Sequence, residues 1–159
     1  MQVLLVPIAG HRYALDAREV VEVLPMVEYR RAGTGPAWLL GLANLRGKLT
    51  PLVDLSIIVE RTPTARTLGA RIVVLRLEND LFAVRPDESR CIGLVVPEVT
   101  RLAQVDFDQE SSHEGFAFFG APHLGPTALD HEGMVQLLRC RRLLEGDDAL
   151  RELPTRMDV

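Results

Sequence analysis

Short apolar runs separated by turn residues dominate the N-terminal third of the chain. Residues 2–8 (QVLLVPI) are rich in Val, Leu and Ile, and an Ala-Gly-His turn separates them from a second run at 12–15. This pattern predicts a β-hairpin. Residues 40–46 and 48–54 repeat the arrangement on either side of Gly47, so a second hairpin is expected there.

The segment between the two hairpins carries helix-start and strand-break signals. Asp16 is followed three positions later by Glu19, a spacing that suits an N-cap and its N3 partner, so a short helical turn is expected at 17–21. Residues 22–30 have the composition of a strand. Pro25 interrupts them, because proline cannot donate a hydrogen bond to a β-ladder.

The rest of the chain continues the pattern of short strands with few helices. Residues 91–96 (CIGLVV) are apolar throughout, which predicts a strand buried on both faces. The other elements that the pattern predicts are a short helix at 55–59, a mobile linker at 60–69, a strand at 70–77, a hairpin over 127–140 and a charged helix at 141–153. The expected fold is therefore mainly β, of the barrel type, with small helices.

A weak internal repeat suggests two similar units. Residues 13–27 align with 92–106, and residues 50–59 align with 135–144, in the same order in each half. Neither unit is large enough to bury a core alone, so the two are expected to pack together. We expect one domain over 1–159, with barrel one near 13–59, barrel two near 70–140, and an N-terminal strand and a C-terminal helix completing the packing.

Composition narrows the function. Of the 159 residues, 47% are apolar and 25% are charged, which is typical of a globular chain. The net charge of −4 argues against nucleic-acid binding, which requires a basic face. No apolar run is long enough for a signal peptide or a membrane span, so a cytoplasmic protein is expected. Cys91 and Cys140 have no CxxC spacing and are expected to be buried, free thiols that act as small apolar side chains.

Sequence motifs for catalysis or metal binding are missing. The chain has no P-loop, GxGxxG, GxSxG or HExxH pattern, and no histidine pair has metal-ligand spacing on one element. This shifts the expectation toward a non-catalytic binding module without cofactor or metal. The alternative is a small ligand-binding or metal-dependent barrel in which His113, His123 and His131 converge at a mouth. The single tryptophan, Trp38, is expected to be core.

One stretch carries a family resemblance. Residues 41–55 read GLANLRGKLTPLVDL and resemble the signature of the CheW-like domain family, a Gly-x-x-Asn-Leu-Arg-Gly run leading into an apolar strand. The matching residues are Gly41, Asn44, Leu45, Arg46, Gly47, Pro51, Val53, Asp54 and Leu55. RYALDAREVVEVLP before the signature, and IGLVVPEVTRL and ALDHEGMVQLLRCRRLL after it, also resemble the family, so the likeness covers nearly the whole chain.

The resemblance implies a fold and a role. Family members are two packed five-stranded SH3-like barrels that act as adaptors without catalysis. The stand-alone type couples the cytoplasmic tip of a chemoreceptor to the regulatory domain of a CheA-type histidine kinase. The chain is similar to that type, which implies a cytoplasmic adaptor recruited to receptor arrays at the inner membrane.

The resemblance also implies roles for individual residues. Glu22 and Arg46 match positions that form a salt bridge in the family, and Phe116 lies near a phenylalanine that packs against the kinase. Arg46 keeps two interpretations, a structural brace on Glu22 or a direct partner contact. The region around 78–91 is longer than the corresponding hairpin of the family, so the resemblance does not define that surface of the second barrel.

Overall fold

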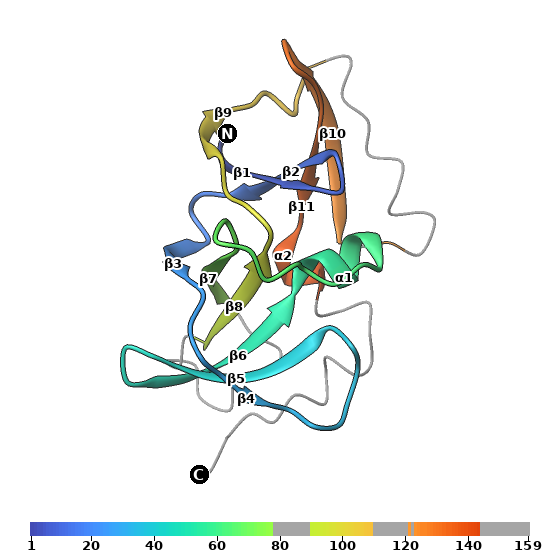
Figure 1. Cartoon of the computed structure of the whole chain (residues 1–159). Helices are drawn as coiled ribbons and strands as arrows, with labels where there is room; N and C mark the ends of the chain where they lie inside the picture. Colours follow the sequence, from blue (N-terminus) through green and yellow to red (C-terminus); the bar gives the residue numbers. More distant parts are fainter. Residues whose placement is uncertain (78–89, 110–120, 122, 144–159) are drawn as a thin grey trace.

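Two packed β-sheets form the molecule. The computed structural model describes residues 1–77, 90–109, 121 and 123–143. Within these residues eleven strands and two short helices are present, and the strands divide into a five-stranded and a six-stranded sheet (Figure 1). The predicted mainly β architecture of two packed units with short helices is thereby confirmed.

The five-stranded sheet, here the terminal sheet, is built from both ends of the described chain. Its strands, in spatial order, are β10 (Leu124–Asp130), β11 (Gly133–Leu138), β2 (His11–Asp16), β1 (Gln2–Ile8) and β9 (Arg101–Gln104). All neighbours are antiparallel except β2 and β11, which run parallel with Tyr13 opposite Gln136. In Figure 1, dark blue β1 and β2 accordingly lie beside yellow β9 and orange β10 and β11.

The six-stranded sheet, here the inserted sheet, comes from the continuous stretch between β2 and β9. Its strands, in spatial order, are β3 (Val20–Pro25), β7 (Arg71–Leu77), β8 (Arg90–Val96), β6 (Lys48–Asp54), β5 (Leu39–Leu45) and β4 (Arg30–Arg31). A single parallel pair, β6 with β8, joins two antiparallel halves. Helix α1 (Leu55–Glu60) follows β6, and helix α2 (Cys140–Leu143) follows β11.

Strand membership does not follow the ranges expected from the repeat. Strand β2 falls within 13–59 but lies in the terminal sheet, while β7 and β8 fall within 70–140 but lie in the inserted sheet. The parallel pairs explain the difference, because β2 pairs with β11 and β6 pairs with β8 across long stretches of sequence. Local patterns specify that strands exist and leave their distant partners undetermined.

One shared core holds the two sheets together. Its buried residues come from both sheets and both helices, and include Leu4, Val6 and Leu15 of the terminal sheet and Val53, Val73 and Leu94 of the inserted sheet. Trp38 belongs to this cluster at 7% exposure, so its predicted core position is confirmed. Two smaller clusters lie on the other sides of the sheets, one centred on Val3 and Val135 and one on Leu52 and Ile72.

The local predictions around the first sheet strands are mostly confirmed. The hairpins around residues 9–10 and 46–47 form, and the strand after residue 22 is broken, with β3 ending at Pro25. The prediction of a helical turn at 17–21 is wrong. Asp16 Oδ1 accepts a hydrogen bond from the Arg18 N–H (3.0 Å), which closes a tight turn, and β3 begins at Val20 before a helix can develop.

Later elements follow the predictions with two changes. Strand β8 is buried over Ile92–Val96, as its apolar run predicts, and α1 matches the helix expected at 55–59. The linker expected to be mobile is held at Thr64, as described below. Of the helix expected at 141–153, the described part contains α2 alone, and residues beyond 143 lie outside it. In the described residues, no helix has the length and apolar character to cross a membrane.

Candidate interaction site

The signature stretch forms the β5–β6 hairpin, and its turn needs two left-handed residues. Arg46 has φ +53° and Gly47 has φ +82°, so both central positions of the two-residue turn lie in the region that type I′ hairpins require. Asn44 Oδ1 accepts a hydrogen bond from the Gly47 N–H at 2.8 Å, which closes the turn from its side. Glycine adopts this conformation without strain, whereas arginine is strained in it by about 1–2 kcal/mol.

Arg46 reaches from this turn to β3. Its Nε lies 3.0 Å and 2.9 Å from the two carboxylate oxygens of Glu22. The Arg46 side chain is 74% exposed and that of Glu22 25% exposed. Pairs of this exposure contribute about 0–1 kcal/mol. The contact therefore fixes the direction of the turn more than it stabilises the fold, and most of the guanidinium surface stays open.

Other signature residues shape the backbone around the hairpin. Gly41 has φ +151°, and a Cβ at this position would lie 1.9 Å from the Arg30 carbonyl oxygen, so only glycine lets β4 approach β5 this closely. Leu45 is buried in the small cluster under the inserted sheet. Pro51 lies one position before the β6–β8 ladder begins at Leu52, where its missing N–H removes no rung of that ladder.

Asp54 is the best-connected polar residue of the signature. It is 2% exposed and is the N-cap of α1, where Oδ1 accepts hydrogen bonds from the N–H groups of Ser56 (3.0 Å) and Ile57 (3.4 Å). These bonds satisfy N–H groups that the first helical turn leaves without partners. The signal was present in the sequence, because an aspartate stands directly before the apolar helical run.

The same carboxylate anchors the linker that follows α1. Thr64 donates its N–H to Asp54 Oδ2 (2.9 Å) and its hydroxyl to Asp54 Oδ1 (2.7 Å). The Thr64 hydroxyl also lies 2.9 Å from Ser56 Oγ. Asp54 therefore positions both the helix and the linker. Sequence spacing could not reveal the contact with Thr64, because it depends on the linker folding back over ten residues.

A second polar contact joins helix α1 to the terminal sheet. The Tyr13 hydroxyl donates to Glu60 Oε1 at 2.5 Å, from β2 to the last residue of α1. Burial, together with this hydrogen bond to a carboxylate, raises the pKa of Tyr13 well above its ordinary value of 10.0. The phenol thus remains a donor through the neutral and alkaline range, and a polar bond ties α1, the helix that follows β6, to the terminal sheet.

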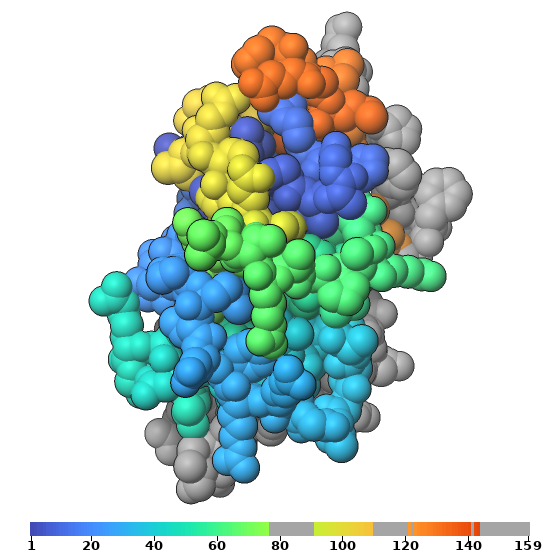
Figure 2. Space-filling view, viewed as in Figure 1, coloured from blue at the N-terminus to red at the C-terminus, as the bar shows by residue number. Residues whose placement is uncertain are grey.

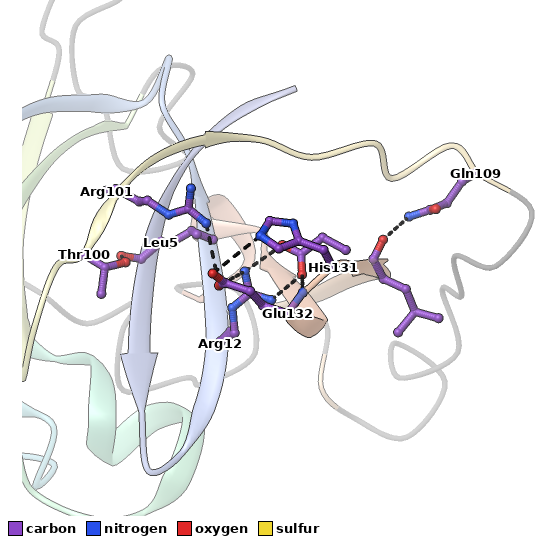
Figure 3. Close-up of polar contacts among 9 residues, drawn as sticks. Leu5, Arg12, Thr100, Arg101, Gln109, His131 and Glu132 are labelled. Atoms are coloured by element: carbon purple, nitrogen blue, oxygen red, sulfur yellow. Dashed lines mark hydrogen bonds and ion pairs between the residues drawn. The ribbon is translucent and has the colours of Figure 1, made fainter.

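Side-chain contacts also bring the outer strands of the terminal sheet together. Arg101 of β9 lies 3.6 Å from Glu132 in the β10–β11 turn, and Gln109 donates to the Leu129 carbonyl at 3.0 Å (Figure 3). Arg12 of β2 adds a bidentate pair to Asp130, with both distances 2.7 Å. The sheet therefore curls until its edge strands meet through side chains.

The histidines do not form the metal site that the alternative function requires. His123 directly precedes β10 and His131 directly follows it, so an extended strand of about 3.3 Å per residue holds them roughly 25 Å apart. That separation excludes a shared ion and corrects the hypothesis of convergence. His123 is half-buried, and burial lowers its pKa, whereas His131 is exposed beside Glu132 at 3.6 Å. His113 lies outside the described residues.

The remaining candidate groups are the possible metal ligands, the two cysteines and Phe116. Among the described residues no group of three or more His, Cys, Asp or Glu side chains could hold a metal ion. Cys91 and Cys140 are both free, as expected, but only Cys140 is buried, where burial raises its pKa, while Cys91 is partly exposed. Phe116 and residues 78–89 of the longer loop lie outside the described residues.

An exposed apolar strip borders the Glu22–Arg46 pair. Strand β3 is an edge strand of the inserted sheet, pairing with β7 on one side and with no strand of the described chain on the other. Its Val21 is 45% and its Val23 39% exposed, on either side of Glu22 in the sequence. Glu22, which alternates with these valines along the strand, points to the other face, where it holds Arg46. Exposed valines at a free strand edge are features of a protein-binding surface.

Fold and site together define a class, a β-sheet interaction module built from two packed units. Comparison with known proteins identifies the family. The CheW-like domain model matches residues 2–148, and the chain belongs to the CheW-like domain family. Membership makes it a non-catalytic adaptor or scaffold of chemotaxis rather than an enzyme.

Individual relatives agree with this assignment. The chain is 22% identical over 143 residues to the chemotaxis protein CheW of Helicobacter pylori, covering 88% of this chain and 79% of the relative. It is 24% identical over 146 residues to the chemotaxis protein CheW of Klebsiella aerogenes, covering 91% and 82%. The scaffolding protein TtCheW of Thermoanaerobacter tengcongensis has a similar structure, with a TM-score of 0.72 and 20% identity over 90% of this chain and 86% of that one.

Proposed function

We propose that this protein couples the cytoplasmic tips of chemoreceptors to the regulatory domain of a CheA-type histidine kinase. In this proposal the protein is cytoplasmic and is recruited to receptor arrays at the inner membrane. Membership of the CheW-like family supports the general role. The observation that carries the finer proposal is the edge of β3, which no strand of the described residues covers and which exposes Val21 and Val23.

The edge of β3 offers two kinds of contact within one short strand. Val21 and Val23 supply apolar area, and the backbone edge supplies N–H and C=O groups. Arg46 of the β5–β6 turn, held by Glu22, adds a charge on the other face of the strand. A partner segment lying along β3 would gain backbone hydrogen bonds together with apolar burial. We assign this surface to one of the two partners and Phe116, by resemblance, to the kinase.

The mechanism is coupling through binding. A rigid adaptor that holds the receptor and the kinase at two surfaces transmits a change in one partner as a change in the affinity or geometry of the other. The shared core, the Tyr13–Glu60 bond and the anchored linker keep the two sheets in one arrangement. A rigid arrangement suits an adaptor that passes a movement of one bound partner to the other.

Binding measurements test the proposal. Immobilised protein is exposed to a CheA-type regulatory domain and, separately, to a receptor cytoplasmic-tip fragment, and we expect dissociation constants of about tens of micromolar or tighter. Val23→Lys should abolish binding of one partner, while Leu129→Lys, at an exposed leucine of the terminal sheet, should leave that binding intact. Absence of binding to both partners by the unaltered protein would overturn the proposal.

Phe116 needs its own measurement. If it contacts the kinase, Phe116→Ala should weaken binding of the regulatory domain at least several-fold and leave binding of the receptor fragment unchanged. Equal weakening of both partners, or of neither, would remove Phe116 from the proposed kinase surface.

A further inference from the structure

A groove lies between the anchored linker and the segment that follows β3. It has a volume of about 600 Å³ and is lined by residues 26–29 and 66–68 together with Arg31. A second hollow of about 370 Å³ shares Tyr29, Arg31 and Arg66 with it and continues over the loop at 32–37. Figure 2 shows the green linker lying against the blue segment on this face of the molecule. The two hollows therefore adjoin at Tyr29, Arg31 and Arg66.

Charge and aromatic character distinguish this groove from the rest of the acidic chain. Two of its three charged lining residues, Arg31 and Arg66, are arginines, and the third is Glu28. The net charge of the protein is −4, so a groove with an excess of positive charge runs against the overall balance. Such a groove attracts an acidic ligand through the local field.

Arg66 is held in position before any ligand arrives. Its guanidinium stacks over the Tyr29 ring at 5.5 Å and donates a hydrogen bond to the Tyr29 hydroxyl at 2.6 Å. Two positions earlier, Thr64 is fixed by the buried Asp54. A guanidinium has five N–H donors, and the hydroxyl uses one, so others remain for a carboxylate. Immobilising a long side chain on binding costs conformational entropy. Because Arg66 is already held by Tyr29, that cost is smaller here.

The groove also offers apolar area. Leu68 is 99% exposed, an unusual state for a leucine held on an anchored linker, and Met26 and Val27 line the same hollow. Apolar side chains next to arginines and a tyrosine reproduce the residue types that are enriched at protein-binding surfaces. Two adjoining hollows fit an extended peptide better than a flat membrane surface.

We propose that this groove binds an extended segment of a partner protein in which carboxylates alternate with large apolar side chains. Arg31 and Arg66 pair with the carboxylates, and Leu68, Met26 and Tyr29 contact the apolar side chains. The groove is lined by other residues than the exposed strip of β3. The inference therefore does not depend on which partner uses that strip.

A labelled peptide tests the groove directly. The probe is a fluorescein-labelled peptide of repeated Leu-Glu-Asp, and its neutral counterpart is repeated Leu-Gln-Asn, with binding to the full chain followed by fluorescence anisotropy. We expect saturable binding of the acidic peptide that weakens as NaCl rises, because the contacts are charged. Arg31→Gln and Arg66→Gln should each weaken binding about two- to fivefold, and the double variant by about tenfold, the range of exposed charge contacts.

Matched control variants distinguish binding in the groove from non-specific attraction between the peptide and the arginines of the protein. Arg18→Gln removes the same charge at an exposed turn outside the groove and should leave the dissociation constant unchanged. Leu68→Ser should weaken binding of the acidic peptide without altering the net charge of the protein. In a parallel arm, vesicles of phosphatidylcholine with one third phosphatidylglycerol are sedimented with the protein.

The outcomes divide cleanly. Tight acidic-peptide binding that depends on Arg66 and Leu68 but not on Arg18 supports the proposal. Equal loss in the Arg18 variant, equal binding of the neutral peptide, or vesicle binding that depends on Arg66 without peptide binding would each overturn it. Far-ultraviolet circular dichroism of every variant shows that a loss of binding is not a loss of fold.

Discussion

Replacing Asp54 by asparagine should destabilise the fold far more than an ordinary loss of charge. The carboxylate is 2% exposed and accepts four hydrogen bonds, three at Oδ1 and one at Oδ2. An asparagine amide offers one acceptor oxygen and one NH₂ group. In the better of its two orientations the oxygen occupies the Oδ1 position, and the NH₂ group then faces the Thr64 N–H.

The expected magnitude follows from that geometry. The partly buried Thr64 N–H loses its acceptor and opposes a second donor, and the three remaining hydrogen bonds lose the assistance of the charge. We expect the free energy of unfolding to fall by about 2–4 kcal/mol. Thr64→Val removes a single hydroxyl and should cost about 1 kcal/mol. Because both changes act on one network, the double variant should lose less than the sum of the two.

Urea denaturation followed by tryptophan fluorescence measures these values. Trp38 is the only tryptophan and is buried, and its carbonyl accepts the Asp54 N–H at 2.8 Å, so its emission reports on this region. Asp108→Asn, at an exposed loop residue, is the matched control and should change the free energy by less than about 0.5 kcal/mol. A loss no larger than this in Asp54→Asn, or strict additivity with Thr64→Val, would refute the reasoning.

Three further predictions concern single contacts. Arg46→Gly removes the strain of an arginine in the left-handed conformation and also removes an exposed ion pair, so the free energy of unfolding should change by less than about 1 kcal/mol. Binding of one partner should fall, and unchanged binding would remove Arg46 from the interaction surface. The bidentate bond from Arg12 lowers the pKa of Asp130 below its ordinary 3.8, so the stability from this pair is fully present above that pH and is lost progressively as pH falls below it toward the folded pKa. The difference in unfolding free energy between the unaltered protein and Asp130→Asn should therefore stay constant from about pH 7 to about pH 5 and shrink below about pH 4, and a difference that does not shrink below about pH 4 would contradict the pairing. In Tyr29→Phe the one remaining tyrosine, Tyr13, should ionise well above pH 10 in an ultraviolet titration, and a midpoint at the ordinary value would mean that its bond to Glu60 is absent in solution.

Local chemistry explains what the sequence revealed. The hairpin at 39–54 was predictable because its turn residues and apolar runs lie within a few positions of one another. The pairing of Glu22 with Arg46 was an expectation from family resemblance, and the structure places the two side chains in contact at 2.9 Å. The high exposure of Arg46 could not be read from residue types, and it reduces the stability expected from that pair.

Distant contacts account for what the sequence did not reveal. The parallel partners of β2 and β6, which are β11 and β8, could not be derived, because parallel pairing leaves no turn signal between the strands. The linker has the composition of a flexible segment, and nothing in that composition indicates that Thr64 bonds to a carboxylate ten residues earlier. The groove beside Tyr29 depends on this fold-back and was therefore also hidden.

The order of the strands has a consequence for synthesis on the ribosome. Strands β1 and β2 emerge first. The partner of β1, β9, ends at Gln104, and the parallel partner of β2, β11, ends only at Leu138, with Tyr13 opposite Gln136. At about 5–20 residues per second, β2 waits roughly 6–25 s for β11. The inserted sheet, continuous from β3 to β8, has all of its strands well before β11 emerges. During this interval the β1–β2 hairpin exposes apolar residues and two unpaired edges, so it is the segment where a nascent chain is most open to chaperones and to mispairing.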